Sequence, residues 1–419
     1  SLLERLRHDE TLPPGHPAAK SLLTPRSVVI VDEASTLSNR DHAELLRHVA
    51  NAGATLRTVG DPAQHSSVEA GGAWTAIVEQ HPSTTPALTE NRRMQGDRMA
   101  DVRQAAEEYR DGHIAQALRR LESADRLVTA ATSTELLDTL SVDWYLDWRR
   151  HLAAPNEIAP SRMLAENHTV RRELNERAQQ LLRADGLIEP NGVKIGEATF
   201  HIGDQVIARQ QHRNLKPAGG DRNSFVRNGT RGVVVAIDAP HGAAPNLVVD
   251  FDQRGLITVP NEFLTKRLRP GVTGGLAPAY AMTTHAAQGD TYEASRGVVT
   301  DRSSPAGTYV TLTRGQHDLR LYAVSASTFG PASPAEEHNL PVSSDRRTIE
   351  ERIEAKLARP LPTQLATRAD PDLAQFHHYQ QHPVRHLEQL EDPIAARAAR
   401  VKLGRARQRT LRDLPHGLV

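Results

Sequence analysis

Ser27 to Val31 reads SVVIV, a run of apolar β-branched residues that ends on two carboxylates, Asp32 and Glu33. This composition is typical of a buried parallel strand. Residues 39–50 then carry apolar residues at helical spacing, and residues 54–59 (ATLRTV) form a second apolar run that ends on a Gly-Asp pair. A strand, a helix and a strand with polar residues at the strand ends predict a doubly wound α/β fold, whose ligands lie beyond the carboxyl ends of the strands.

Strand and helix signals continue along the chain. Hydrophobic periodicity predicts helices over residues 96–122, 135–152 and 169–185, and strands over residues 161–167, 298–301, 309–314 and 319–324. Between residues 199 and 268 the runs become short and β-rich, with turn signals such as Asn228-Gly229, which is typical of a small barrel. Because α/β character resumes at Ala279, we expect the barrel to be inserted in a second α/β core.

The composition excludes several classes of protein. The 51 Lys and Arg residues balance the 51 Asp and Glu residues, so any affinity for nucleic acid must come from locally arranged charge. Cysteine is absent, which excludes disulfides, thiolate zinc sites and cysteine nucleophiles and fits a reducing compartment. No apolar stretch approaches the roughly 18 residues of a membrane span and no signal peptide leads the chain, so we expect a cytoplasmic protein.

Three groups of polar residues near the first strands fit phosphate chemistry. At the end of an apolar strand, Asp32 fits a ligand of Mg²⁺ on a nucleotide, and Glu33 fits the activation of an attacking water. Gln64 follows the next strand and fits the orientation of that water. Arg92 and Arg93, in LTENRRM at a strand end or turn, fit developing phosphate charge. Each signal alone has an ordinary alternative, because acidic pairs end many strands and paired surface arginines are usually solvated.

The second core carries two further groups. In MTTHAAQGDTYE, hydroxyl, imidazole and amide groups fall within one turn at a strand-to-helix junction, and such donors suit phosphate or a DNA backbone. The residues of this group are Thr283, Thr284, His285, Gln288 and Gly289. In YVTLTRG, Arg314 ends a predicted buried strand, where it would reach a nucleotide held by the first core as an arginine finger. The alternatives are a capped helix start and a salt-bridged surface arginine.

In order and spacing, the segments DEAS, GDPAQHSSVEAGG, LTENRRM, TTHAAQG and YVTLTRG resemble motifs II to VI of superfamily 1 helicases of the RecD-like branch. The chain is most similar to the helicase region of conjugative relaxases of the MobF type (TraA, TrwC, TraI), in which VRNGTRG, THAAQGDT and YVTLTRG follow in this order. The resemblance covers residues 1–325. It implies an ATP-dependent DNA helicase that uses ATP and Mg²⁺, moves 5′ to 3′ on single-stranded DNA and works with other plasmid-transfer proteins.

The resemblance also implies a domain organisation. It predicts two RecA-like P-loop NTPase cores, an inserted SH3-like β-barrel and a helical tail. The expected parts are the first core at residues 1–122, the second core at 123–198 and 271–328, the barrel at 199–270, and the linker and charged tail at 329–419.

Roles for single residues follow from the same resemblance. Asp32 would ligate Mg²⁺, Glu33 would be the general base, and Gln64 would sense the γ-phosphate. Arg93 would contact the γ-phosphate, with Arg92 as the alternative, and Arg314 would be the arginine finger. A further set would couple the nucleotide to the grip on single-stranded DNA. These residues are Thr283, Thr284, His285, Gln288 and Gly289, with Asn228 in the turn of the inserted barrel.

Two departures from the family pattern qualify these expectations. No GxxxxGK[ST] phosphate loop occurs, and its nearest imitation, Ala19-Lys20-Ser21, lacks the two glycines. With Ser1 as its first residue, we therefore expect the chain to be a truncated part of a helicase and impaired as an ATPase. The alternative is a catalytically inactive fragment that binds single-stranded DNA or a protein partner. The second departure is Ala286, where many relatives have a lysine after the histidine.

The C-terminal tail carries two weaker signals. Four histidines, His377, His378, His382 and His386, cluster without a carboxylate, so metal binding is not favoured over a surface cluster. They also lack the pattern of a relaxase nickase, and nicking is not predicted. The last residues are basic, which fits a nucleic-acid or partner contact less well than a solvated helix.

Overall fold

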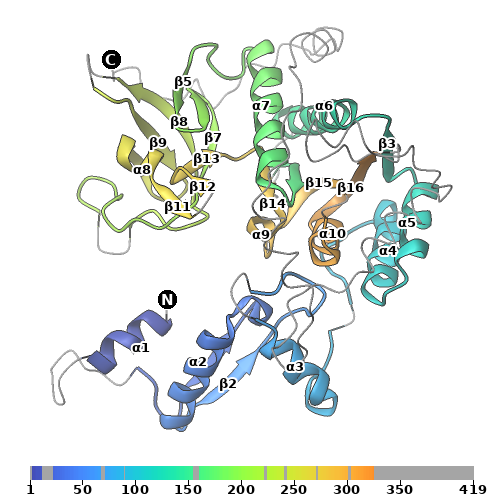
Figure 1. Ribbon diagram of the computed structural model, residues 1–419, viewed down its shortest axis with the longest axis vertical. Helices are drawn as coiled ribbons and strands as arrows, with labels where there is room; N and C mark the ends of the chain where they lie inside the picture. Colours follow the sequence, from blue (N-terminus) through green and yellow to red (C-terminus); the bar gives the residue numbers. More distant parts are fainter. Residues whose placement is uncertain are drawn as a thin grey trace, which may run out of the picture.

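The structure of this chain is a computed structural model (Figure 1). It describes residues 2–11, 22–67, 71–88, 90–153, 160–220, 224–239, 243–269, 272–300 and 303–324. Within these residues no helix is long and apolar enough to cross a membrane. The histidine cluster and the basic end of the tail lie outside the described residues.

The first unit is built on a parallel pair of strands. β1 (Val28–Val31) pairs with β2 (Thr55–Thr58), and η1 (Ala34–Thr36) and α2 (Asn39–Asn51) connect them, which confirms the strand–helix–strand prediction. Ser38 caps α2 by accepting a hydrogen bond from the backbone of Asp41. Helix α1 (Leu2–Thr11) contacts α2 and contributes to the same apolar cluster as β1.

The expectation that β1 is a buried strand is wrong for one of its faces. Val29 is buried against α1 and α2, whereas Val28 and Ile30 are 60% and 69% exposed. Side chains alternate between the two faces of a strand, and within the described part of the chain the helices of this cluster cover one face of β1. The apolar sequence therefore predicted the strand correctly, but it did not predict that one face of the strand is exposed.

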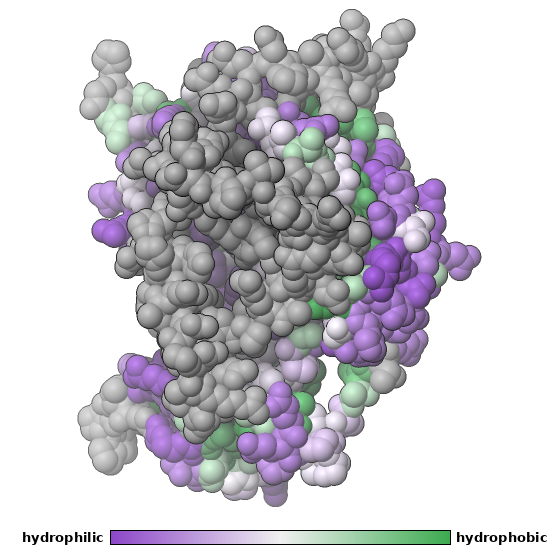
Figure 2. All heavy atoms as spheres, turned by 45° about the vertical axis from the view of Figure 1, so that its right-hand side comes forward, coloured by the Kyte–Doolittle hydropathy of each residue, from purple (hydrophilic) through white to green (hydrophobic). Residues whose placement is uncertain are grey.

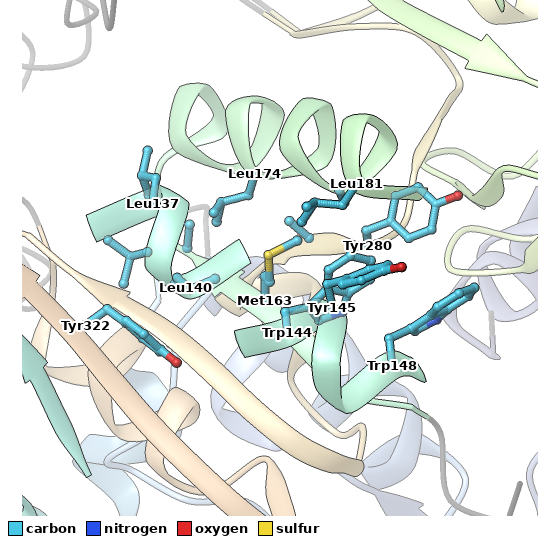
Figure 3. Packing of buried hydrophobic residues seen from close by; sticks show 14 of the residues in the cluster. Leu137, Leu140, Trp144, Tyr145, Trp148, Met163, Leu174, Leu181, Tyr280 and Tyr322 are labelled. Atoms are coloured by element: carbon cyan, nitrogen blue, oxygen red, sulfur yellow. The ribbon is translucent and has the colours of Figure 1, made fainter. Parts of the chain in front are cut away.

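The second unit is a five-stranded sheet in which every strand is parallel to its neighbours. Its strands, in spatial order, are β14 (Ala281–Thr283), β4 (Arg162–Ala165), β15 (Tyr292–Val299), β16 (Gly315–Val324) and β3 (Leu127–Ala130). Helices α6 (Ser133–Ala153) and α7 (His168–Ala184) pack on one face. Their cluster contains Trp144, Tyr145, Trp148 and Tyr280 (Figure 3). The expected α/β fold with a parallel sheet is thus observed.

The other face of this sheet is covered by helices that come earlier and later in the chain. After α3 (Ala73–Gln80) and the short turns η2 (Pro82–Thr84) and η3 (Asp97–Met99), helices α4 (Ala100–Arg110) and α5 (Ile114–Ser123) pack on β3 and β16 together with α10 (Pro305–Leu312). Figure 1 shows α4 and α5 beside this sheet and away from β2. Residues 100–122, which were expected to belong to the first core, therefore pack with the second unit.

A β-rich segment is inserted between α7 and β14, at the position predicted for the barrel. It contains a hairpin of β5 (Gly192–Ile195) and β6 (Ala198–His201) and a five-stranded antiparallel sheet in the order β10-β9-β8-β7-β13. The strands of this inserted sheet are β7 (Gln205–Ala208), β8 (Arg231–Asp238), β9 (Asn246–Phe251), β10 (Gly255–Val259) and β13 (Leu276–Pro278). Helix α8 (Asn261–Thr265) and the pair β11 (Arg267–Arg269) and β12 (Val272–Thr273) complete the segment.

A buried carboxylate joins the inserted segment to the second unit. The Oδ1 atom of Asp204, which is 0% exposed, accepts a hydrogen bond from the Tyr280 hydroxyl at 2.8 Å, and its Oδ2 atom accepts one from Gln179 at 2.7 Å. Burial raises the pKa of Asp204 to about 6. Because Gln179 lies on α7 and Tyr280 immediately precedes β14, the segment is attached where it leaves and rejoins the parallel sheet.

The prediction of a strand over residues 309–314 is wrong, because α10 covers most of this stretch. Local capping explains the difference. Ser304 accepts a hydrogen bond from the backbone of Gly307, and Pro305 occupies the first turn of the helix. The Glu166 carboxylate in turn accepts hydrogen bonds from the backbone and hydroxyl of Ser304, both at 2.8 Å. The β-branched residues of YVTLTR therefore lie on a short buried helix.

Stability should depend on pH through Glu166. Burial raises the pKa of Glu166 to about 7, so its ionisation in the folded protein is unfavourable. The unfolded carboxyl ionises near its usual pKa of 4.5, and the free energy of unfolding should therefore fall as the pH rises from about 4.5 to about 7. We expect Glu166→Gln, which retains an acceptor for Ser304, to remove this contribution of about 3 kcal/mol to the pH dependence.

Urea unfolding followed by circular dichroism between pH 4.5 and 8 measures this difference. Glu173, whose pKa burial also raises to about 7, is present in both proteins, so the difference between their curves isolates Glu166. If the free energy of unfolding of the two proteins changed with pH along parallel curves, the prediction would be contradicted.

Candidate functional site between the two units

The candidate site begins at the carboxyl end of β1. Glu33 adopts a left-handed backbone conformation, with φ of 52° and ψ of 43°, and precedes the 3₁₀ turn η1. This region is uncommon for a residue other than glycine, and such residues concentrate at functional sites. Asp32 is exposed, and its Oδ1 atom accepts a hydrogen bond from the Glu33 backbone at 2.9 Å. The two carboxylates predicted from the sequence thus follow one another in a tight turn.

The loop after β2 holds Gln64 from one side. Asp61 accepts hydrogen bonds from the Ala63 backbone at 3.0 Å and from the Gln64 side-chain nitrogen at 3.3 Å. Among the described residues, the buried oxygen of the Gln64 amide has no hydrogen-bond partner. Asp61 also contacts the Tyr309 hydroxyl of α10, and burial, then Asp61, raises the pKa of that tyrosine. The Gln64 amide is therefore oriented with an acceptor atom to spare.

A residue of the second unit reaches Glu33 directly. β14 ends at Thr283, which caps the one-turn helix α9 (Thr284–Ala287) by accepting a hydrogen bond from Ala286. In the turn that follows, the side-chain nitrogen of Gln288 donates to Glu33 Oε2 at 2.7 Å. Gly289 comes next with a φ of 85°, a conformation that favours glycine. The sequence placed Gln288 and Glu33 in one family pattern, and the fold brings them into contact.

Two arginines lie on the same side of this contact. Arg93 donates to the Thr291 hydroxyl at 2.9 Å and to the Thr313 carbonyl at 3.1 Å. Arg314 is 1% exposed, and burial, then the proximity of Arg93, lowers its pKa to about 10. The charge of Glu33 acts on both guanidinium groups in the opposite direction. Two cations that repel one another beside a single carboxylate are a favourable place for an anion.

The structure separates the two alternatives for the paired arginines. The Arg92 side chain is 83% exposed and donates to Glu90 at 2.8 Å. Arg93 instead turns toward the second unit. The position of Arg92 matches the alternative of a solvated surface arginine, and Arg93 is the member of the pair that lies at the candidate site.

One residue of the site escaped the sequence analysis. His65, next to Gln64, is 4% exposed and stacks on His285 of α9 with ring centroids 3.5 Å apart. Its Nε2 atom lies 2.9 Å from the Thr284 hydroxyl. Burial, then the neighbouring His285, lowers the pKa of His65 to about 3, so this imidazole is neutral at neutral pH. No local pattern predicts a contact across 219 residues, and the only signal was the place of His65 in GDPAQHSS.

The residues predicted to bind nucleic acid lie in two places. His285 is exposed at the stack with His65, whereas Thr284 is 2% exposed and its hydroxyl faces His65. Asn228 is exposed in the turn before β8, beside Gly229. Gly229 and Thr230 line a groove of about 360 Å³ together with Ala286 and Asp290.

The residues present fit a nucleotide-bound magnesium ion. The Asp32 carboxylate is exposed at the strand end, and carboxylate oxygens are the ligands that Mg²⁺ prefers. One or two carboxylates suffice for an ion held mainly by phosphates and water. Within the described residues no group of three His, Asp or Glu side chains could hold a metal without such a partner.

Comparisons with known proteins agree with the motifs. A family model described as an AAA domain matches residues 2–132. The conjugal transfer protein TraA of Agrobacterium fabrum is 27% identical over 310 residues, covering 72% of this chain and 25% of that protein. A probable conjugal transfer protein TraA of Sinorhizobium fredii is 25% identical over 307 residues, with the same coverage. The chain spans about a quarter of the length of these relatives.

Among solved structures, the chain is similar to the Pif1 helicase from Bacteroides in complex with ADP-AlF3 and single-stranded DNA. The two are 15% identical with a TM-score of 0.41, and the match covers 75% of this chain and 72% of that one.

The predicted resemblance to conjugative proteins is confirmed by the sequence relatives: the chain is similar to TraA conjugal transfer proteins, and its first part matches an AAA domain. The TraA relatives match most of its described residues.

Proposed function

We propose that this chain is the motor of an ATP-dependent DNA helicase, with ATP between the two units. The observation that carries the proposal is the convergence of four side chains from distant parts of the chain on one place between the two units. These are Glu33 of the first unit, Arg93 of the connecting segment, and Gln288 and Arg314 of the second unit. Gln64 lies in the loop whose Asp61 contacts Tyr309 of the second unit. In this proposal the two units are RecA-like cores and the inserted sheet is an SH3-like barrel.

The geometry suits phosphoryl transfer to water. Arg93 and Arg314 supply positive charge where the γ-phosphate would develop negative charge. Glu33 would accept a proton from the attacking water, and the free oxygen of Gln64 would orient that water. ATP would supply the bond to be cleaved and Mg²⁺, held through Asp32, would neutralise phosphate charge. Because Gln288 of the second unit donates a hydrogen bond to one oxygen of Glu33, the orientation of this carboxylate depends on the position of the second unit.

Single-stranded DNA is the proposed partner. His285 and Asn228 are exposed near the groove between the inserted sheet and α9, and Thr283 holds the start of that helix. Closing and opening of the cleft would shift α9, and with it the grip on the strand. Movement from 5′ to 3′ and a cytoplasmic location belong to the same proposal and rest on the motif resemblance and the composition, and an association with other plasmid-transfer proteins is supported by the TraA relatives.

A second candidate function is binding of single-stranded DNA without turnover. The observation that favours it is the lack of a GxxxxGK[ST] match within the 419 residues, since that loop and its lysine normally hold the β- and γ-phosphates. Equilibrium binding of a labelled oligonucleotide, measured beside ATP hydrolysis, separates the two candidates. Binding with no hydrolysis at any concentration of ATP would favour the second.

The two adjacent arginines test the motor directly. We expect Arg93→Ala to lower DNA-stimulated ATP hydrolysis at least 100-fold, because it removes a cation from the proposed γ-phosphate position. Arg92→Ala removes the same charge one residue away, on the surface, and should change the rate less than twofold. Steady-state hydrolysis with and without single-stranded DNA measures both. Equal losses in the two variants would contradict the assignment of Arg93.

A further inference from the structure

The short turn between α9 and β15, residues 288–291, contacts three of the residues to which we assign phosphate chemistry, one in each unit and one in the connecting segment. Three hydrogen bonds make these contacts. They are Gln288 to Glu33 at 2.7 Å, Arg93 to the Thr291 hydroxyl at 2.9 Å, and Arg314 to the Asp290 carbonyl at 3.3 Å. The position of this turn therefore sets the positions of a carboxylate and of two guanidinium groups at once.

A fourth contact ties the same turn to the inserted sheet. The Asp290 carboxylate forms an ion pair with Arg231, the first residue of β8. The Tyr292 hydroxyl donates to the same carboxylate oxygen at 2.7 Å, and the Arg231 guanidinium carbon lies 5.7 Å from the centre of the Tyr292 ring. Tyr292 is 0% exposed, so the ion pair rests on a fixed surface.

The two ends of this link differ in rigidity. Arg231 lies in a strand paired on both sides, and its carbonyl accepts a hydrogen bond from Asp252 at 2.9 Å. The next residue, Gly232, lies so close to β9 that a Cβ would be 2.6 Å from the Asp250 carbonyl. The turn, in contrast, contains Gly289 in a left-handed conformation, and besides a backbone hydrogen bond from Asp290 to Ala287 it is held by side-chain contacts with Glu33 and Arg314. The sheet is thus the rigid end and the turn the adjustable one.

We propose that Arg231 is a positioning residue for the nucleotide cleft. By holding Asp290, Arg231 fixes the position of the turn. The turn in its place positions the Gln288 amide that donates to Glu33 and the Asp290 carbonyl that accepts from Arg314. A shift of the inserted sheet against the second unit is passed to the cleft, and a change in the cleft is passed back to the sheet by the same contacts. The meaning of this link for catalysis rests on the proposed function, whereas the mechanical link itself does not.

Hydrogen exchange of the nucleotide-free chain tests the link. We expect Arg231→Gln to accelerate exchange at least fivefold at the amides of Asp290 and Tyr292, which donate to Ala287 and Arg314. Arg267→Gln, which removes an exposed arginine from β11 of the inserted segment, is the matched control and should leave these amides unchanged. Unchanged exchange at both amides in Arg231→Gln, or a change confined to β7 and β8, would overturn the proposal.

A double-mutant cycle and a catalytic measurement complete the test. Since Arg231 and Asp290 act through one ion pair, exchange in the double variant Arg231→Gln/Asp290→Asn should be no faster than in the faster single variant. Arg231→Lys, which keeps the charge, should restore most of the protection. In DNA-stimulated ATP hydrolysis we expect Arg231→Gln to lower kcat about tenfold with KM for ATP within twofold. Should the unaltered chain bind single-stranded DNA but fail to hydrolyse ATP, the second candidate function is favoured and the exchange result still decides the link.

Discussion

Glu33→Gln should abolish at least 99% of DNA-stimulated ATP hydrolysis while the variant still folds and binds nucleotide. Glutamine has almost the same shape as glutamate but cannot accept the proton of the attacking water, and a positioned general base contributes about 100- to 10,000-fold to a rate. The amide oxygen of the new side chain can still accept the hydrogen bond from Gln288, so the contact between the two units is retained. Single-turnover hydrolysis and equilibrium binding of a fluorescent nucleotide measure the two effects separately.

The neighbouring carboxylate provides the comparison. Asp32→Asn should weaken the binding of Mg²⁺, because this side chain is proposed to hold the ion, and the lost hydrolysis should be partly restored at higher Mg²⁺ concentration. No concentration of Mg²⁺ should rescue Glu33→Gln. Hydrolysis by Glu33→Gln within tenfold of the unaltered chain would remove Glu33 from the role of general base.

Trp144→Ala should cost about 4 kcal/mol of the free energy of unfolding of the second unit. Trp144 is 0% exposed at the centre of the cluster between α6, α7 and the parallel sheet, where its ring packs edge-on against Tyr280 (Figure 3). Large-to-small changes of a buried tryptophan cost about 3–5 kcal/mol through lost burial and the remaining cavity. The substitution also removes the donor to the Ser161 carbonyl, which the indole nitrogen contacts at 3.0 Å.

Two further variants separate these contributions. Trp144→Phe keeps an aromatic ring but removes the donor to the Ser161 carbonyl. The unpaired carbonyl should lower the free energy of unfolding by about 1–2 kcal/mol, in addition to the effect of the smaller ring. Leu256→Ala removes apolar surface from a side chain that is 45% exposed and should cost less than about 1 kcal/mol. Urea unfolding followed by circular dichroism gives all three values. A loss below about 2 kcal/mol in Trp144→Ala would show that the cluster collapses around the cavity.

Local sequence predicted most elements of the fold because each carries its own signal. The run SVVIV and the run ATLRTV became neighbouring parallel strands, and SRMLAEN became β4 together with the N-cap of the following helix α7. The strand predicted for YVTLTR was wrong because its β-branched composition favours a strand, while the Ser304 cap and the proline at the helix start decide for α10. The Glu166 carboxylate that holds Ser304 lies 138 positions away in the sequence and leaves no signal in this stretch.

The molecular surface illustrates a second limit of local patterns. Figure 2 shows hydrophobic residues interspersed with hydrophilic ones on the visible described surface. Periodicity tells which residues prefer burial but not how many faces of a strand are covered, and for that reason it did not predict the exposure of Val28 and Ile30.

The sequence by itself determined the class of this protein and the chemistry available to it. The order of DEAS, GDPAQ, LTENRRM, TTHAAQG and YVTLTRG predicted the resemblance to RecD-like helicases, because residue types and their spacing are properties of the chain alone. The tertiary structure decided which of these residues meet. The contact of Arg93 with Thr313, the stack of His65 on His285, and the ion pair of Arg231 with Asp290 join positions 59 to 220 residues apart. Contacts at such separations depend on how the strands and helices pack in space, and no neighbouring residue records them.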